Sequence, residues 1–326
     1  MKVILPLAGL GSRVRPHTYT RPKPLISVAG NTVLGHVLDG LAGLPIDEVI
    51  FIVGHLGNQI EEYVRPRYAF QTRYIEQTEL RGQAHALDLA AEFIDQPVLI
   101  IFVNTIVNTD LTRLLETQDD GVLYVKEVED PRRFGVAVLD HGVVTRLVEK
   151  PQTPVSNLAV IGYYYLRNWQ LLRTALHDVI EKGIQTGGEY YLADALQLMI
   201  EAGARFQAWT VDMWEDCGTI EALLHTNRVL LDHGHERKPQ QMEHSVIIPP
   251  VNIGSGTQIR ASVVGPHVSI GEGATVTGAT IADSIIGDGT TITDISLRGS
   301  VIGSKVTVRG VAHRLNVGDT SAVELA

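Results

Sequence analysis

The sequence predicts an α/β domain followed by a smaller all-β domain. Two observations favour this fold class: apolar, strand-like runs alternate with helix-period segments early in the chain, and aliphatic residues recur about every five or six positions in its last part. A third is a change in composition, because every Phe, Tyr and Trp precedes a polar stretch at 233–241. We therefore expect two hydrophobic cores within the 326 residues.

The first domain alternates β and α segments. Runs of strand length and segments with apolar residues on one helical face follow each other at 2–6, 32–41, 48–53, 73–76, 83–93 and 98–103. This order predicts a Rossmann-like, mostly parallel sheet with helices on both faces. Ligands of such sheets bind beyond the carboxyl ends of the strands, so we expect the site where the strands at 2–6 and 98–103 end.

The second domain consists of short repeats. Aliphatic residues recur at Ile253, Ile259, Val264, Ile270, Val276, Ile281, Ile286, Ile292, Leu297, Ile302 and Val308. This period predicts a β-helix; an up-and-down β domain with unusual turns is the alternative. The aliphatic–glycine pairs, such as Ile253–Gly254, resemble the hexapeptide repeats of left-handed parallel β-helices. We therefore expect a first domain at 1–236, a linker at 237–244 and a left-handed β-helix at 245–326.

A glycine-rich, cationic segment follows the first strand. Gly9 and Gly11 precede Arg13 and Lys23, and no Asp or Glu occurs before Asp39, although the chain carries a formal charge of -10. Glycine lets the main chain approach a ligand closely, and Arg and Lys attract phosphate oxygens. The segment therefore predicts a site for an anion, with a purely structural turn as the alternative.

Composition excludes several other classes of protein. No apolar run is long enough to cross a bilayer, so we expect a cytoplasmic protein without a membrane partner. The acidic balance and the lack of a basic stripe argue against nucleic-acid binding. Cys217 is the only cysteine, which rules out an internal disulfide.

The cationic segment also carries a longer motif. Residues 9–24 have the pattern G-x-G-x-R-x-x-P-x-T-x-x-x-P-K-P. This string resembles the signature of the sugar-1-phosphate nucleotidylyltransferases, and the C-terminal repeats make the chain most similar to the long-form glucose-1-phosphate thymidylyltransferases. The resemblance implies transfer of a nucleotidyl group from dTTP or UTP to a sugar 1-phosphate, such as glucose 1-phosphate, with release of pyrophosphate.

The resemblance implies a nucleotide site on two segments. The side-chain amide of Gln77 would bond a pyrimidine edge and Gly82 would bring main chain to the base, while Gln83 stands where the family usually has Thr. The implied nucleotide-binding residues are Leu7, Ala8, Gly9, Gly11, Ser12, Arg13, Gln77 and Gly82.

The resemblance also implies a sugar-phosphate site. Glu149 would accept bonds from sugar hydroxyls and Lys150 would meet the phosphate. The implied residues are Phe134, Gly135, Glu149, Lys150, Asn157, Gly162 and Glu189, and the catalytic cations are Arg13, Lys23 and Lys150.

One expected metal ligand is replaced. Trp214 to Thr219 match the family element W-x-D-x-G-T, in which the Asp, here Asp216, binds Mg²⁺. The second ligand is usually an Asp after a buried strand, and here Asn104 stands there without a negative charge. We expect Mg²⁺ at Asp216 and Asn104 and a weakened or inactivated enzyme; Asp110 is a possible substitute ligand.

Two other functions stay open at this point. A nucleotide-sugar-binding regulatory protein would keep the substrate pockets and lose the metal charge. A bifunctional uridylyltransferase/acetyltransferase would use a histidine of the β-helix, such as His267 or His313. The resemblance further implies a homo-oligomer formed through the β-helix.

Overall fold

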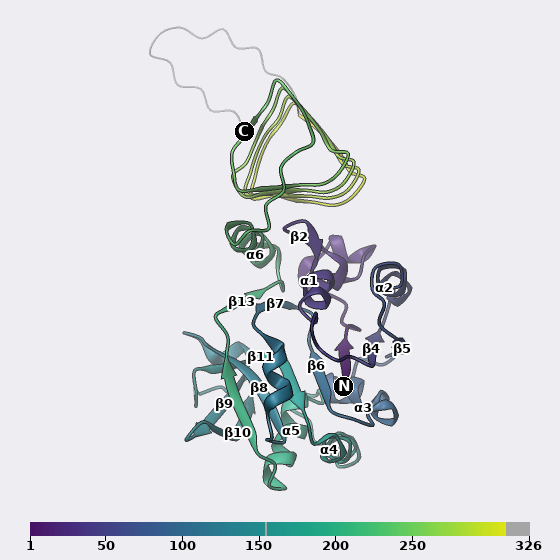
Figure 1. Ribbon diagram of the computed structural model, residues 1–326, viewed down its shortest axis with the longest axis vertical. Helices are drawn as coiled ribbons and strands as arrows, with labels where there is room; N and C mark the ends of the chain where they lie inside the picture. Colours follow the sequence, from purple (N-terminus) through teal and green to yellow (C-terminus); the bar gives the residue numbers. More distant parts are fainter. Residues whose placement is uncertain (154, 311–326) are drawn as a thin grey trace. The chain divides into compact units, whose positions relative to one another are not determined.

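The computed structural model describes residues 1–153 and 155–310, so His313 lies outside the described residues. The chain forms two compact units. The first contains Met1–Ile26 and Asn31–Leu223, and the second joins Ser27–Gly30 to the described residues from Leu224 onward. Figure 1 draws the chain coloured along the sequence from the N-terminus to the C-terminus.

The first unit is built on a nine-stranded sheet in the order β5-β4-β1-β6-β11-β8-β12-β10-β9 (Figure 1). The strands are β1 (Lys2–Pro6), β4 (Glu48–Val53), β5 (Thr72–Glu76), β6 (Val98–Ile101), β8 (Gly121–Glu127), β9 (Gly135–Asp140), β10 (Val143–Glu149), β11 (Leu158–Leu166) and β12 (Phe206–Thr210). The shorter strands β3 (Asn31–Thr32), β7 (Thr105–Asn108) and β13 (Met213–Asp216) also belong to this unit.

Helices accompany the sheet. They are α1 (Val33–Asp39), α2 (Gly57–Val64), α3 (Gln83–Leu89), α4 (Trp169–Glu181), α5 (Leu192–Glu201) and the start of α6 (Ile220–Asp232). Two of them, α1 and α3, lie in the segments 32–41 and 83–93 that the sequence predicted as helical. Among the described residues, no helix combines the length and apolarity that a membrane crossing requires.

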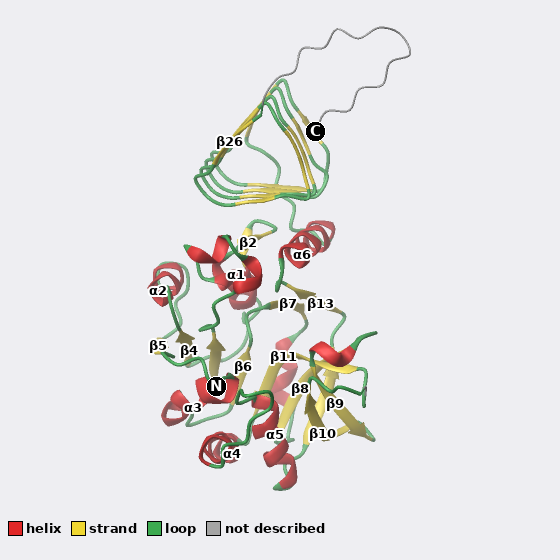
Figure 2. Cartoon of the chain, turned by 180° about the vertical axis from the view of Figure 1, so that it is seen from behind, coloured by secondary structure: helices red, strands yellow, loops and turns green. Residues whose placement is uncertain are grey.

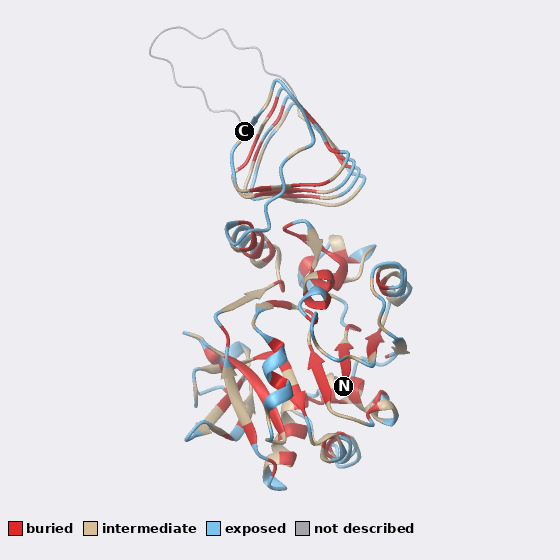
Figure 3. Ribbon diagram, viewed as in Figure 1, coloured by how far each residue is buried: buried red, intermediate tan, exposed pale blue. Residues whose placement is uncertain are grey.

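Both faces of the sheet are buried. Ile4, Ile50 and Ile100 join the core formed with α3, α4 and α5. The alternating residues Val3 and Phe51 belong to the other face of their strands and are also fully buried. Figure 3 shows the strands of this sheet coloured largely as buried. The predicted α/β class is therefore confirmed.

The sheet is mixed rather than mostly parallel, which corrects one detail of the prediction. Strands β5, β4, β1 and β6 are parallel, but β11 runs antiparallel to both of its neighbours, β6 and β8. The alternation of strands and helices stops after residue 121, where β8, β9, β10 and β11 follow one another without an intervening α-helix. Strands β9 and β10, joined only by residues 141–142, pair antiparallel as a hairpin, as short connections between neighbouring strands favour.

The second unit contains a β-helix with three parallel sheets, and its coils trace a triangle with strands on the sides (Figure 2). The sheets are β14-β17-β20-β23-β26, β15-β18-β21-β24 and β16-β19-β22-β25. The strands are β14 (Gln241–Glu243), β15 (Val246–Ile247), β16 (Val251–Ile253), β17 (Gln258–Arg260), β18 (Val263–Val264), β19 (Val268–Ile270), β20 (Thr275–Thr277), β21 (Thr280–Ala282), β22 (Ile285–Ile286), β23 (Thr291–Thr293), β24 (Ser296–Arg298), β25 (Val301–Ile302) and β26 (Thr307–Arg309), and β2 (Ser27–Val28) also belongs to this unit.

The aliphatic repeats form the interior of the coils. The predicted positions from Ile253 to Ile292 are buried in one cluster, and Leu297, Ile302 and Val308 pack against it. The β-helix is therefore confirmed. The segment 237–244, expected as a linker, contributes β14, which pairs with β17, and a bridge between Arg237 and Asn252.

Candidate functional site

The glycine loop after β1 is held by Thr18 and Lys23. Gly11 has φ +59, and a Cβ at this position would lie 2.9 Å from Lys23 Cβ and 3.0 Å from Thr18 Cγ2. The Thr18 hydroxyl donates to the Gly11 carbonyl oxygen over 2.9 Å. Only glycine combines this backbone conformation with such close packing, so the loop has a defined shape before any ligand binds.

A cavity of about 510 Å³ opens at this loop. Eight predicted site residues line it: Leu7, Gly9, Gly11, Ser12, Arg13, Lys23, Asn104 and Glu189. Sequence reasoning missed Pro6, Pro24, Phe102 and Val103 as lining residues, and it singled out Gln83 only as a departure from the family motif. The cavity lies at the carboxyl ends of β1 and β6, where the fold class predicts a ligand.

Lys23 is a partly buried cation at this cavity. Burial lowers its pKa from the ordinary value of 10.5, while the Asp216 carboxylate raises it and Arg13 lowers it. An ammonium group with little water around it gains most from an added negative charge. The site therefore favours an anionic ligand.

Asn104 and Asp216 come together through β7 and β13. Asp216 pairs with Thr105 in this antiparallel ribbon, and the Cys217 N–H donates to the Asn104 carbonyl oxygen over 2.8 Å. A carboxylate and an amide oxygen are hard donors that suit Mg²⁺, with the remaining positions left to water and phosphate oxygens. Among the described residues, no cluster of three or more His, Cys, Asp or Glu side chains could hold a metal alone.

Asp110 serves as a helix cap. Its Oδ1 accepts from the Thr112 N–H over 2.9 Å and from the Thr112 hydroxyl over 2.6 Å, at the start of η5 (Leu111–Glu116). These bonds lower the pKa of Asp110. Asp110 does not line the 510 Å³ cavity, so the structure offers no support for it as a substitute ligand.

Gln77, directly after β5, is hydrogen-bonded through its side chain to Gly82. The Gln77 N–H donates to the Val53 carbonyl over 2.8 Å, and its side-chain Nε2 donates to the Gly82 carbonyl over 3.3 Å. Gly82 has φ +115, and a Cβ there would lie 2.5 Å from the Tyr190 carbonyl oxygen. The structure thus brings the two predicted base-binding residues together and explains why Gly occupies position 82.

Glu149 and Lys150 lie beside Tyr191. Lys150 Nζ donates to the Tyr191 hydroxyl over 2.6 Å and lies 3.8 Å from Glu149 Oε1. The Glu149 side chain is only 11% exposed, and a Cβ at Gly135 would lie 2.8 Å from its Oε2. Burial raises the pKa of Glu149; Lys150 opposes this effect, and Asp194 and Glu189 add to it. The sequence offered no signal for Tyr191, because its contact with Lys150 is made only by the fold.

Of the other predicted sugar-site residues, Phe134 lies beside Lys150, whose backbone N–H donates to the Phe134 carbonyl oxygen over 3.0 Å. Phe134 packs edge-on against Trp214 with ring centroids 5.3 Å apart. Gly162 has φ +87, and its carbonyl accepts from the Phe102 N–H over 2.9 Å. Asn157 is exposed, and its Nδ2 donates to Glu127 Oε1 over 2.5 Å. None of these three predicted residues, Phe134, Gly162 and Asn157, lines the cavity described above.

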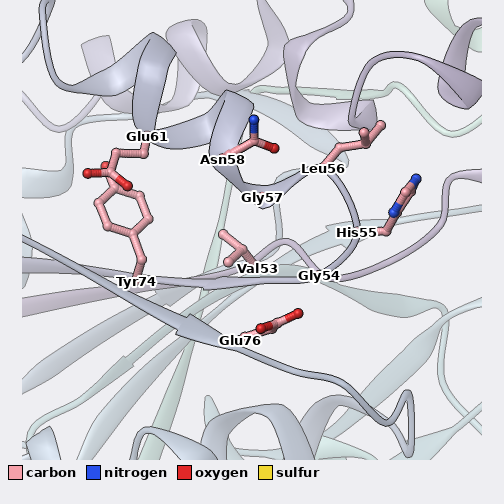
Figure 4. Close-up of a pocket in the computed structure, with 9 residues that line it drawn as sticks. All are labelled: Val53, Gly54, His55, Leu56, Gly57, Asn58, Glu61, Tyr74 and Glu76. Atoms are coloured by element: carbon pink, nitrogen blue, oxygen red, sulfur yellow. The ribbon is translucent and has the colours of Figure 1, made fainter.

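A second cavity of about 400 Å³ lies between β5 and the loop that joins β4 to α2 (Figure 4). Tyr74 and Glu61 point toward one another on one wall, and Glu76 projects from β5. A Cβ at Gly54 would lie 2.8 Å from the Ala8 carbonyl oxygen, so this loop packs against the glycine loop. The second cavity therefore flanks the first.

His267 of the β-helix has carboxylates on both sides. Its Nε2 lies 2.9 Å from Asp232 Oδ1, and its Nδ1 lies 3.6 Å from Asp283 Oδ1. A general base needs one ring nitrogen that can face its substrate. Because both nitrogens of His267 face acidic partners, this arrangement favours a structural role over the acetyl-transfer alternative.

Comparisons with known proteins agree with this geometry. The family model described as "Nucleotidyl transferase" matches residues 2–233. The chain is 34% identical over 243 residues to the low-salt glycan biosynthesis nucleotidyltransferase Agl11 of Haloferax volcanii, with coverage of 71% of this chain and 66% of that protein. It is 32% identical over 273 residues to a glucose-1-phosphate thymidylyltransferase of Streptomyces antibioticus, with coverage of 79% and 74%.

A solved structure shares the fold of the matched part. UDP-glucose pyrophosphorylase in complex with UDP-glucose superposes with a TM-score of 0.61 at 21% identity, and the match covers 71% of this chain and 98% of that one. The family match spans the whole nine-stranded sheet and every residue that lines the 510 Å³ cavity. The chain therefore belongs to the nucleotidyl transferase family.

Proposed function

We propose that the chain is a sugar-1-phosphate nucleotidylyltransferase that uses UTP or dTTP and, as its sugar substrate, glucose 1-phosphate. One observation carries the proposal: the glycine loop, Arg13 and Lys23 line one cavity together with Asn104 and Glu189. The thymidylyltransferase of Streptomyces antibioticus supports the choice of a glucose 1-phosphate substrate. Uridine and thymidine differ by one methyl group, worth about 1 kcal/mol in an apolar pocket, so both nucleotides are proposed.

The proposed reaction is a single in-line displacement. A phosphate oxygen of the sugar 1-phosphate forms a bond to the α-phosphorus of the triphosphate, and the bond from that phosphorus to the bridging oxygen of the β-phosphate breaks. The electron pair leaves with pyrophosphate. The attacking phosphate is already ionised at neutral pH, so no general base is needed, and positioning and charge stabilisation carry the catalysis.

Different cations and backbone groups would bind the triphosphate and the sugar phosphate. Arg13 and the backbone of the glycine loop would hold the triphosphate, and the partly buried Lys23 would stabilise negative charge near the α-phosphate. Lys150, whose Nζ is held by the Tyr191 hydroxyl, would exchange this partner for the sugar phosphate. Glu149 beside it would accept bonds from sugar hydroxyls.

Asp216 and Asn104 would hold Mg²⁺ in this proposal. Mg²⁺ supplies charge neutralisation on the phosphate oxygens when bound. Asn104 contributes an oxygen but no charge, so the site would bind the ion more weakly than a pair of carboxylates. The proposed enzyme is accordingly a slow one.

The test compares pyrophosphate release by the chain with release by Asn104→Asp, using glucose 1-phosphate with UTP or dTTP at several Mg²⁺ concentrations. Restoring the carboxylate should raise the rate by about 10²-fold and lower the Mg²⁺ concentration needed. Asn108→Asp is the matched control, because it places the same charge on an exposed position at the end of β7, the strand that begins directly after Asn104.

The outcomes separate the remaining functions. A large gain with Asn104→Asp alone supports a metal site at position 104. Equal gains in both variants point to a general charge effect and contradict that site. If neither protein releases pyrophosphate but both bind a nucleotide sugar, the regulatory alternative replaces the enzyme.

A further inference from the structure

The side-chain amide of Gln77 is held by two acceptors. Its Nε2 donates to the Gly82 carbonyl over 3.3 Å and lies 3.1 Å from His85 Nδ1. The residue is only 6% exposed. An amide nitrogen carries two hydrogens, so these two contacts use its whole donor capacity.

His85 suits the role of an acceptor. It lies on the first turns of α3, and burial and the nearby Arg81 lower its pKa from the ordinary value of 6.5, while Asp88 and Glu79 oppose this shift. A neutral imidazole with its hydrogen on Nε2 presents an unprotonated Nδ1. In that tautomer Nδ1 accepts from Gln77 and cannot donate to it.

The orientation leaves a single group of Gln77 for a ligand. Within the part of the chain that the structure describes, Gln77 Oε1 accepts no hydrogen bond. Uracil and thymine carry an N–H at ring position 3, whereas cytosine carries an unprotonated nitrogen there. An amide locked with its oxygen toward the base therefore complements the first two bases and opposes the third.

We infer that His85 is a positioning residue that sets base specificity by holding Gln77 with its oxygen toward the base. The inference rests on the proposed nucleotide site and adds the residue that selects the base. Without an acceptor at position 85, the amide could rotate by half a turn and present its N–H groups to cytosine. The preference for uracil or thymine over cytosine, which depends on ring position 3, would then weaken.

The experiment measures binding rather than turnover, so it does not depend on the metal site. Dissociation constants for UTP and CTP are measured by calorimetry for the unmodified chain, His85→Ala and His85→Asn. The ratio of the two constants should fall about tenfold in His85→Ala, the effect expected from one hydrogen bond. Asn places a carbonyl oxygen near the position of Nδ1 and should restore the ratio.

A matched control removes a second histidine from the neighbouring cavity. His55→Ala should leave the UTP to CTP ratio unchanged, because His55 lines the 400 Å³ cavity and, in the part of the chain that the structure describes, makes no hydrogen bond to the Gln77 side chain. A general loss of structure would weaken the binding of both nucleotides alike, and His85→Asn would not reverse it.

Two kinds of result would overturn the inference, and they differ in whether the proposed function survives. If the unmodified chain prefers UTP but His85→Ala keeps that preference, or His85→Asn fails to restore it, the role of His85 is wrong and the proposed function stands. If the unmodified chain binds neither nucleotide, the proposed nucleotide site itself fails and the inference falls with it.

Discussion

Single glycines determine the shape of the candidate site. Gly82 places its backbone against Tyr190, and Gly135 lies against the Glu149 carboxylate. In each place a side chain would displace a neighbour that the site needs. The residues that define this site therefore include positions with no chemistry of their own.

Gly82→Ala should destabilise the first unit by about 2 to 4 kcal/mol, because it combines a strained backbone with a clash against Tyr190. The matched control is Gly183→Ala. Gly183 also has positive φ, at +63, but a Cβ there would meet no described atom within 4 Å. The control should cost about 1 kcal/mol. Chemical denaturation measures both values, and equal losses would contradict the clash.

Glu149→Gln should make the protein more stable at alkaline pH while weakening sugar-phosphate binding. The pKa of Glu149 is raised above its ordinary value of 4.5, chiefly by burial. Its contribution to stability is therefore fully present below pH 4.5 and is lost as the pH rises through the raised pKa. Glutamine does not titrate and avoids this loss.

Melting temperatures at pH 5 and pH 8 check this expectation. The melting temperature of Glu149→Gln minus that of the unmodified chain should be larger at pH 8 than at pH 5. Glu116→Gln, at an exposed position, is the control and should show no such difference. A constant offset at the two pH values would show that Glu149 does not lose stability on ionising.

At the scale of elements, the sequence predicted strands better than their directions. The predicted strand at 48–53 is β4, and the predicted helix at 83–93 contains α3. The antiparallel direction of β11 was missed, because hydrophobic periodicity marks a strand but does not reveal which way it runs. Strand β14 was missed for another reason: its three residues are exposed, and backbone pairing with β17 holds it in place.

The candidate site likewise contains residues that the sequence predicts and residues whose role depends on contacts made by the fold. Arg13, Lys23 and Asn104 were predicted together because motifs and strand ends mark them. Tyr191 and His85 act through contacts with Lys150 and Gln77 that the fold alone creates. Local sequence patterns do not predict such contacts.

Ile281→Ala should lower the free energy of unfolding of the β-helix by about 2 to 4 kcal/mol, because Ile281 is fully buried inside the coils. Thr280→Ala changes the neighbouring exposed residue of the same strand, β21, and should stay within about 0.5 kcal/mol of the unmodified chain. Denaturation followed by circular dichroism compares the two, and similar losses would argue against an inward Ile281.

At the scale of the whole molecule, we propose that the chain assembles as a homo-oligomer through the β-helix. Met242, Val246 and Ile248 lie close together in sequence at its first coil, and 51%, 56% and 41% of their surfaces are exposed. Val246→Glu should lower the mass measured by light scattering if this surface joins copies. Thr280→Glu, in the same sheet of the β-helix, is the control; an unchanged mass for Val246→Glu would place the contact elsewhere.

The stacked coils have a consequence for how this family member can change length. Val246, Val263, Thr280 and Ser296 occupy equivalent positions in successive coils, and each strand pairs with its counterparts in the adjacent coils. Losing one residue inside a strand would turn the next inward aliphatic side chain toward water, whereas losing or duplicating a complete coil would preserve every alignment. The turns tolerate a single residue fewer, since Val263 and Thr280 are 17 positions apart and Thr280 and Ser296 are 16 apart, and both pairs align. The domain can therefore grow or shrink in units of one turn by tandem rearrangement of its gene.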